Sequence, residues 1–553
     1  MSEPALRRFA RLYTELDAQT AINARVAALK AYFADAESAD AAWAVYFLAG
    51  GKPRQTVPTR LLRRLATRAA GLPDWLFEEC YQAVGDLAET IAHVLPAGHG
   101  DDAAGLAEWI EERLLPLRGL GPAEIEARLL GYWNALDWQG RFLLTKLIGG
   151  GFRVGVSKLL VTRALAEHAG LDQKIVAQRM MGYTDARMAP TPARFERLVA
   201  LGHDGPLEAG APYPFFLAHP LTDVAALGPT GDWQVEWKYD GIRAQVVRRA
   251  GQTWIWSRGE ELVTERFPEI VAACAGLAEG TVLDGEILVW QPGSRDHGAP
   301  APFALLQQRI GRKTLTKKVL ADAPVAFMAY DLLELAAADL RPHRQFERRR
   351  TLENLLAQHP HAGLLISPLV HAADWPGFAS LRAESRARGV EGLMLKQAQS
   401  TYGTGRTRES GLWWKWKVDP LSVDCVLVYA QAGHGRRASL YTDYTFAVWS
   451  GSGTERKLVP FAKAYSGLTD EEFRAVDAVI RKTTIEKFGP VKSVTPSLVF
   501  ELGFEGIQKS PRHKSGIAVR FPRMLKLRGD KKVDEADTLE QLQALLAFDS
   551  PRR

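Results

Sequence analysis

The spacing of apolar residues changes partway along this chain, and that change is the strongest constraint on its fold. Up to about residue 201, apolar residues recur at three- and four-residue intervals, as in LYTELDAQTAINARVAALKAYF and LFEECYQAVGDLAETIAHVL. That spacing is typical of amphipathic helices. Near HDGPLEAGAPYPFF the helical period stops, and segments follow in which apolar and polar residues alternate, such as WQVEWKYD. We therefore predict an all-α region over residues 1–205 and sheet-containing regions after it.

Two further regions are predicted after residue 205. From 206 to 420, strand-like and helix-like segments mix, which is typical of an α+β domain with mostly antiparallel sheets. Over residues 421–553 short strands dominate. One helix interrupts them, and Thr469 with Glu472 has the spacing of a helix capping box. About five strands and one helix fit a small barrel of the OB type.

Composition narrows the class of protein. At 553 residues the chain exceeds one hydrophobic core, and its net charge of +6 is mild for that length. Its three cysteines (Cys80, Cys274 and Cys425) lie far apart, which excludes a disulfide framework and a four-cysteine zinc site and indicates a reducing compartment. No segment approaches the roughly 18 apolar residues of a membrane span, and the N-terminus lacks the apolar stretch of a signal peptide. We expect a cytoplasmic protein without membrane contact.

The segment WQVEWKYDGIR, residues 233–243, contains a candidate nucleophile. Alternation places Glu236, Lys238 and Asp240 on one face of a strand. The Asp240-Gly241 pair predicts a tight hairpin turn, after which the return strand IRAQVV brings Arg243 back to the same neighbourhood. A lysine flanked by carboxylates and an arginine could attack an electrophile. A surface hairpin with a solvated lysine is the alternative.

Lys238 needs assistance to react, because a free lysine has a pKa near ~10.4 and is protonated at neutral pH. An amine that attacks the α-phosphate of a nucleotide requires cations for the phosphates and carboxylates for Mg²⁺. Residues of these types follow on predicted strands, although each taken singly is more often structural. Asp284 and Glu286 share one strand face, and Lys415 and Lys417 share another, opposite Trp414 and Trp416. The others are Arg258, which follows the strand WIWS, Phe327, whose ring could stack on a purine, and Glu391. No Walker, dinucleotide-binding, zinc-protease or CxxC motif is present.

A glycine-rich segment in the helical region, IGGGFRVGVSKLL, precedes a helix with Ser157 as its expected N-cap. Backbone N–H groups at such a helix start suit a DNA phosphate, and Arg153 and Lys158 lie next to them. A helix–helix turn that needs glycine for close packing is the alternative.

These motifs, in this order, resemble those of the ATP-dependent DNA ligases in the covalent nucleotidyltransferase superfamily. KYDGIR matches the family's lysine motif, and SRGEELVTERFPEI, LDGEIL, FMAYDLLE, VEGLMLK, WWKWK and VRFPRMLKLRGDK match the elements that follow it. SRGEEL departs from the family by having Gly259-Glu260 where many relatives have Asn-Gly. The helical region also resembles the DNA-binding domain of the larger ligases, so the resemblance covers most of the chain.

The resemblance implies a role for each matching residue. Lys238 would accept AMP, with Glu236 at the adenine, Phe327 stacked on the base, and Arg243 and Arg258 at the ribose and at the 5′-phosphate or AMP. Glu286 and Glu391 would lie at ribose and metal, and Lys415 and Lys417 at the α-phosphate. The basic C-terminal motif, which orients pyrophosphate, comprises Arg520, Arg523, Lys526, Arg528 and Lys531. Arg406 and Arg408 both fit a further nucleotide-binding arginine, and we assign Arg406.

The function implied is sealing of nicks in duplex DNA with ATP and Mg²⁺, or Mn²⁺ in its place, by a monomeric bacterial enzyme. AMP passes from ATP to Lys238, then to the 5′-phosphate at the nick, and leaves when the 3′-hydroxyl attacks. Three alternatives are an RNA-directed nucleotidyltransferase (a capping guanylyltransferase or RNA ligase), an NAD-dependent ligase, and a non-catalytic DNA-binding scaffold. The helical region argues against the first, the three cysteines and short tail against the second, and the intact motif residues against the third.

Overall fold

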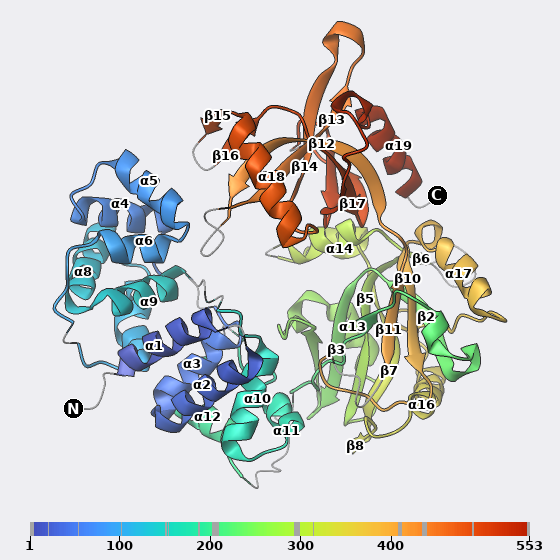
Figure 1. The fold of residues 1–553 in the computed structure, drawn as a ribbon. Coiled ribbons are helices and arrows are strands. Elements are labelled where there is room, and N and C mark those ends of the chain that lie inside the picture. Colours follow the sequence, from blue (N-terminus) through green and yellow to red (C-terminus); the bar gives the residue numbers. More distant parts are fainter. Residues whose placement is uncertain are drawn as a thin grey trace. The chain divides into compact units, whose positions relative to one another are not determined.

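A computed structural model shows helices first, then a mixed region, then strands, in the order that the spacing of apolar residues predicts (Figure 1). Among the residues it describes, no helix has the length and hydropathy of a membrane span. The residues described are 5–19, 21–52, 55–100, 102–149, 152, 154–185, 188–201, 210–291, 299–312, 314–406, 412–433, 440–488, 491–511 and 513–549.

The N-terminal region is helical, as predicted. A long predicted helical segment is broken at Gly85, which ends α5 in the left-handed conformation (φ +75°) before α6 begins. The helices are α1 (Ala5–Ala18), α2 (Ile22–Asp35), α3 (Ser38–Leu48), α4 (Thr59–Ala69), α5 (Asp74–Val84), α6 (Leu87–Val94), α7 (Leu106–Glu108) with a π-helical turn (Trp109–Leu114), α8 (Pro122–Ala135), α9 (Trp138–Gly149), α10 (Lys158–Ala169), α11 (Gln173–Arg179) and α12 (Pro192–Val199).

The middle region contains two sheets. The first has the strand order β1-β11-β10-β2, and the second has the order β4-β3-β5-β7-β8 with β6 and β9 attached. Most neighbours are antiparallel, as predicted, while β1–β11 and β7–β9 are parallel. The strands are β1 (His219–Pro220), β2 (Trp233–Tyr239), β3 (Ile242–Arg249), β4 (Gln252–Ser257), β5 (Thr281–Gln291), β6 (Ala299–Pro300), β7 (Val325–Leu335), β8 (Ala338–Asp339), β9 (Leu364–Ile366), β10 (Val390–Gln397) and β11 (Trp413–Lys417).

Helices cover the outer faces of both sheets. Trp414 and Trp416 pack with α17 (Trp375–Ala383) on the outer side of the first sheet, which leaves Lys415 and Lys417 on the other face, as predicted. The outer side of the second sheet packs on α13 (Pro268–Cys274), α14 (Phe303–Ile310) and α16 (Gln345–Gln358). A short helix, α15 (Lys317–Asp322), precedes β7. The polar residues predicted for the nucleotide site, such as Lys238 and Glu286, lie on the inner faces of the two sheets.

The predicted hairpin at Asp240-Gly241 is wrong. β2 pairs with β10 in the first sheet and β3 pairs with β4 and β5 in the second, so the two strands flanking this dipeptide do not pair with each other. The glycine is required by a close approach instead: a Cβ atom at Gly241 would lie 2.4 Å from the carbonyl oxygen of Ile287. The dipeptide is a crossing point between sheets.

The C-terminal region is a β-barrel of the OB type with more elements than predicted. Its strands are β12 (Leu421–Ala432), β13 (Tyr441–Ser450), β14 (Lys457–Ala464), β15 (Thr484–Phe488), β16 (Val491–Val494), β17 (Val499–Phe504), β18 (Gly506–Lys509), β19 (Ile517–Arg520) and β20 (Arg523–Leu527). The predicted helix is α18 (Asp470–Thr483), with the capping box of Thr469 and Glu472 formed. A second helix, α19 (Leu539–Asp549), inserts Leu542 into the core.

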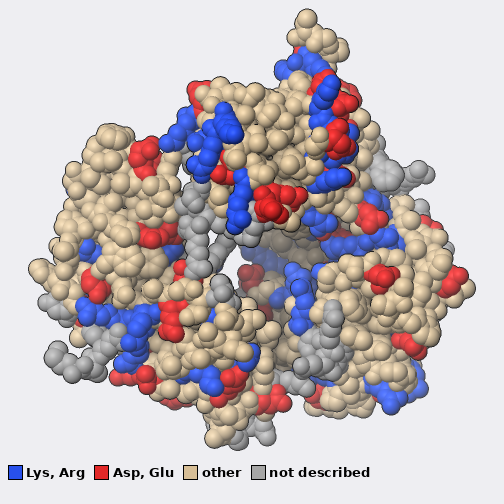
Figure 2. Space-filling view, in the orientation of Figure 1, with Lys and Arg blue, Asp and Glu red and all other residues tan. Residues whose placement is uncertain are grey.

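The chain divides into two compact units. One comprises Met1–Thr56, Ala103–Arg118 and Gly150–Val418, and the other comprises Val57–Asp102, Gly119–Gly149 and Asp419–Arg553. The helical region therefore contributes to both units, and the domain boundaries at 205 and 420 stay predictions. On the face drawn in Figure 2, Lys and Arg side chains are interspersed with Asp and Glu, which agrees with the small net charge of +6.

Candidate active site

Lys238 faces a carboxylate of the neighbouring strand. Its Nζ donates a hydrogen bond to Oε2 of Glu391 on β10 at 2.5 Å, and Nζ of Lys417 on β11 lies 3.4 Å from the same oxygen. β10 is bulged here, beside Gly392. With φ at +137° and a built Cβ only 2.3 Å from the carbonyl oxygen of Trp416, this position requires glycine. The bulge presents Glu391 to both lysines.

Further cations surround this pair. The pKa of Lys415 is lowered by burial and by the neighbouring cations Lys417, Lys238, Arg406 and Arg258. The side chains of Arg406 and Arg258 are exposed. The structure thus brings together five of the cations predicted for the site. Arg408, the alternative to Arg406, lies outside the described residues. This concentration of positive charge suits the phosphates of a nucleotide.

Arg243 is held by the protein itself. Its guanidinium donates to both carboxylate oxygens of the fully buried Asp284, at 3.2 and 2.8 Å, and to the carbonyl oxygen of Phe216 at 2.6 Å. Tyr402 donates its hydroxyl to the same carboxylate at 2.6 Å. The ring of Trp413 lies against the guanidinium, 5.4 Å from its centroid. Arg243 is therefore fixed in orientation.

Glu286 is the candidate carboxylate for a cation. It lies opposite Arg243 in the register of β3 and β5, is half-buried, and has no hydrogen-bond or ion-pair partner among the described residues. Burial raises its pKa to about 8, against the opposing effect of Lys238 and Arg243. A half-buried carboxylate without a partner fits a cation. No group of three His, Cys, Asp or Glu side chains in the described ranges could hold a metal alone.

Glu236 lies in a buried ion pair. Its Oε1 accepts from Nζ of Lys396 at 2.8 Å and lies 3.7 Å from Nη1 of Arg349. Burial lowers the pKa of Lys396, and the carboxylate of Glu236 opposes that shift. At 1% exposure, Glu236 presents little surface to a nucleotide, so the adenine contact predicted for it is not open in this structure.

The base-stacking assignment of Phe327 is wrong for this fold. Phe327 is fully buried in the core on the helix-covered side of the second sheet, the face opposite to Glu286. Tyr330, three residues later on β7, is half-buried and lies within the site. Nζ of Lys396 is 4.4 Å from its ring centroid and donates to its carbonyl oxygen at 3.0 Å. Three residues after Phe327, Tyr330 lies on the opposite face of β7 by alternation, and the register shift falls at Tyr330 itself, between Ala329 and Asp331.

In the helical region, Ser157 is the N-cap of α10, as predicted, and accepts a hydrogen bond from the backbone N–H of Leu160 at 3.3 Å. Lys158 does not point to an open phosphate site. Its ammonium forms an ion pair with Glu260 and donates to the carbonyl oxygen of Met180 at 2.9 Å. Arg153 lies outside the described residues. The direct DNA contact predicted for Lys158 is therefore not available in this structure.

The five cations of the basic C-terminal motif fall into two groups, of which one is ion-paired with Asp424. Arg528 donates to both carboxylate oxygens of Asp424 at 3.0 Å, and Nζ of Lys531 lies 2.5 Å from Oδ2 of the same residue. The motif's other three cations are arranged differently: Arg523 and Lys526 are exposed, and Arg520 lies against the ring of Phe521, 5.1 Å from its centroid. Arg528 and Lys531 are thus ion-paired within the barrel in this structure, and which of the five cations contact pyrophosphate stays a prediction.

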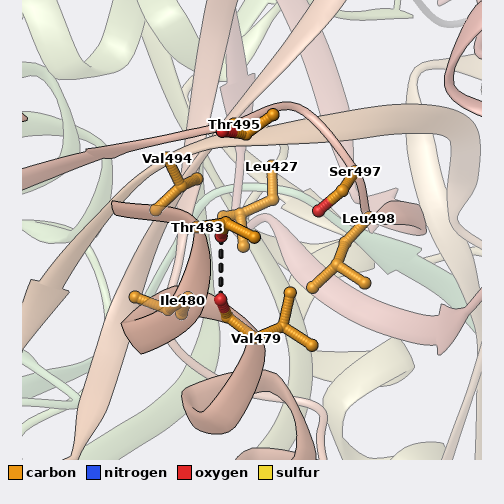
Figure 3. A pocket seen from close by; sticks show the side chains of 8 residues that line it. All are labelled: Leu427, Val479, Ile480, Thr483, Val494, Thr495, Ser497 and Leu498. Carbon is orange, nitrogen blue, oxygen red and sulfur yellow. Dashed lines mark hydrogen bonds between the residues drawn. The ribbon is translucent and has the colours of Figure 1, made fainter. Parts of the chain in front are cut away.

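A small pocket in the C-terminal region is unsuited to a nucleotide. It lies where the end of α18 packs on the barrel, and Oγ1 of Thr483 donates a hydrogen bond within that helix to the carbonyl oxygen of Val479 (Figure 3). No charged side chain lines it. Its lining residues are Leu427, Val479, Ile480, Thr483, Val494, Thr495, Ser497 and Leu498.

Comparison with known proteins gives the same order of regions. Three family models match: the DNA ligase N terminus over residues 5–166, the ATP dependent DNA ligase domain over 216–417 and the ATP dependent DNA ligase C terminal region over 437–531. A probable DNA ligase from Koribacter versatilis is 30% identical over 88% of this chain and 86% of its own length. A DNA ligase from Methanothrix thermoacetophila is 29% identical over 97% of each chain. The solved structure of Pmar-Lig_PreS3 shares the fold, with a TM-score of 0.60 and 15% identity over 94% of this chain and 99% of its own.

The helical, nucleotidyltransferase and OB-type regions together define the class of multidomain nucleotidyltransferases, which confirms the predicted fold class. The chain belongs to the ATP-dependent DNA ligase family, and it is an enzyme of that kind. The RNA-directed and scaffold alternatives are not favoured, because the matches extend to the N-terminal region of DNA ligases.

Proposed function

We propose that this ligase seals nicks in duplex DNA through AMP bound covalently to Lys238. The observation that carries the assignment is the position of Lys238, whose Nζ donates to Glu391 and lies near the cations Lys415 and Lys417. A covalent attack by an amine on a phosphate needs this combination of charges. We further infer that the enzyme acts as a monomer in the cytoplasm.

In the first step, Lys238 gives the proton of its ammonium form to solvent and its nitrogen attacks the α-phosphorus of ATP. The N–P bond forms, the P–O bond to pyrophosphate breaks, and pyrophosphate leaves. Lys415, Lys417, Arg258 and Arg406 supply positive charge for the phosphates. Glu286 and Glu391 would hold Mg²⁺, or Mn²⁺ in its place, and the bound cation would neutralise phosphate charge.

In the second step, a 5′-phosphate oxygen at the nick attacks the AMP phosphorus and the N–P bond to Lys238 breaks. In the third, the 3′-hydroxyl loses its proton and attacks the 5′-phosphorus, and AMP leaves. Tyr330 would be the ring that meets the adenine, because it is accessible where Phe327 is not. Arg243 would contact the ribose or AMP, held there by Asp284. Glu236 would support the base-binding end of the site through Lys396.

Labelled ATP tests the proposal. The wild-type protein should acquire a covalent AMP label and seal a nicked duplex with ATP but not with NAD⁺. Lys238→Ala should lose the label and still bind nicked DNA. Lys318→Ala, which removes an exposed lysine on α15, should behave as wild type. A label that persists in Lys238→Ala, or one that forms from GTP in preference to ATP, would refute the assignment.

A further inference from the structure

The loop after β4 has an unusual backbone conformation at Glu260. Its φ is +61°, and its N–H donates to the carbonyl oxygen of Ser257 at 2.9 Å, closing a tight turn. A left-handed conformation is strained for a residue other than glycine. Such a conformation persists where surrounding contacts maintain it. The turn carries Arg258, one of the exposed cations of the lysine site.

The contact that maintains Glu260 comes from the helical region. Its carboxylate pairs with the ammonium of Lys158, the first residue of α10, and the two side chains are only 16% and 25% exposed. Lys158 is itself anchored, because it also donates to the carbonyl oxygen of Met180. The ion pair is therefore well shielded from solvent, where such pairs are stronger than on an open surface.

Two glycines mark close approaches between the helical region and the arginine loops. A Cβ atom at Gly182 would lie 3.0 Å from the ring of Trp256, two residues before Arg258. A Cβ atom at Gly405, the residue before Arg406, would lie 3.9 Å from Cδ1 of Leu159. The first turn of α10 is thus paired with the first loop through Lys158 and lies near the second at Leu159.

We propose that Glu260 is a positioning residue for Arg258 and that Lys158 is its partner in this role. The ion pair fastens the loop of residues 257–261 to α10, which keeps Arg258 directed at the lysine site. The inference rests on the proposed function, because Arg258 acts on AMP or the 5′-phosphate at the nick. It gives the helical region a part in arranging the site in addition to binding DNA.

Glu260→Gly separates the backbone conformation from the ion pair. Glycine adopts the left-handed turn without strain, so the turn should be kept although Lys158 loses its partner. Sealing by adenylated enzyme in single-turnover experiments should nevertheless fall about tenfold, because a loosened loop misplaces Arg258. Glu260→Gln and Lys158→Met should show the same loss of rate, with the Kd for nicked DNA unchanged within about twofold. Glu261→Gln, which removes a neighbouring exposed carboxylate, is the matched control and should seal at the wild-type rate.

A double-mutant cycle decides whether Glu260 acts through Arg258. If it does, Arg258→Ala with Glu260→Gln should be no slower than Arg258→Ala alone, whereas independent roles would multiply the two losses. Multiplied losses, an unchanged rate in Glu260→Gln, or a loss in Lys158→Met that is wholly a weaker Kd for DNA would each overturn the inference. A wild-type protein that acquires no AMP label would instead refute the proposed function, and the inference with it.

Discussion

Phe327 and Tyr330 occupy the same strand and differ in what they can do. Phe327 belongs to the core between β7 and its covering helices, with no exposed surface, whereas Tyr330 is accessible and borders Lys396. The resemblance of the segment FMAYDLLE to the family's motif does not show which of the two rings meets the base. The choice depends on which face of the sheet each ring occupies, and two residues three positions apart on a strand lie on opposite faces.

Substitutions at these two positions should therefore separate stability from nucleotide binding. Phe327→Ala should lower the free energy of unfolding by about 3–5 kcal/mol, because it removes a fully buried ring. Tyr330→Ala should leave unfolding nearly unchanged and raise the KM for ATP in AMP-label formation about tenfold. Tyr330→Phe keeps the ring and should stay near wild type. A stable Phe327→Ala protein with a raised KM would reverse the assignment.

At the scale of elements, the sequence predicts strands better than their partners. The strand positions of β2, β3, β5, β10 and β11 all follow from alternation and from β-favouring residues. Alternation also places Lys415 and Lys417 on one face. It says nothing about which strand lies beside which, so Asp240-Gly241 could be read as a hairpin although it links two sheets. Likewise, Glu236 and Lys238 share a strand, but only the pairing with β10 shows that one meets Lys396 and the other Glu391.

The Glu236–Lys396 pair joins β2 to β10, and breaking it should lower the free energy of unfolding. Glu236→Gln leaves the buried ammonium of Lys396 without its charged partner, which should cost about 3–5 kcal/mol in urea unfolding. Adding Lys396→Met removes both charges and should recover much of that stability without restoring AMP-label formation. Glu384→Gln, which breaks an exposed ion pair with Arg388, is the control and should change stability by less than ~0.5 kcal/mol. A Glu236→Gln protein as stable as this control would contradict the expectation.

At the scale of the whole molecule, the net charge is only +6, yet the proposed substrate is a polyanion. Binding to nicked duplex should therefore depend on local phosphate contacts, and log Kd should rise linearly with log salt with a slope of about 0.9 per contact. Fluorescence anisotropy at salt concentrations from about 50 to 200 mM measures this slope. Lys238→Ala should change the slope by no more than one contact. A Kd independent of salt would contradict phosphate-dominated binding.

The candidate active site is formed by two sheets that are held apart by apolar side chains. The nucleophile, Glu391 and the β11 lysines belong to one sheet, while Arg243, Glu286 and Tyr330 belong to the other. Between the sheets lies a small apolar cluster that includes Tyr239 and Val390 from the first and Leu288 and Met328 from the second. These side chains do not take part in the chemistry, but their volumes set the distance between Lys238 on the first sheet and Glu286 on the second. Substitutions that change the size of these side chains would appear in a kinetic screen as catalytic defects in residues that never meet the substrate.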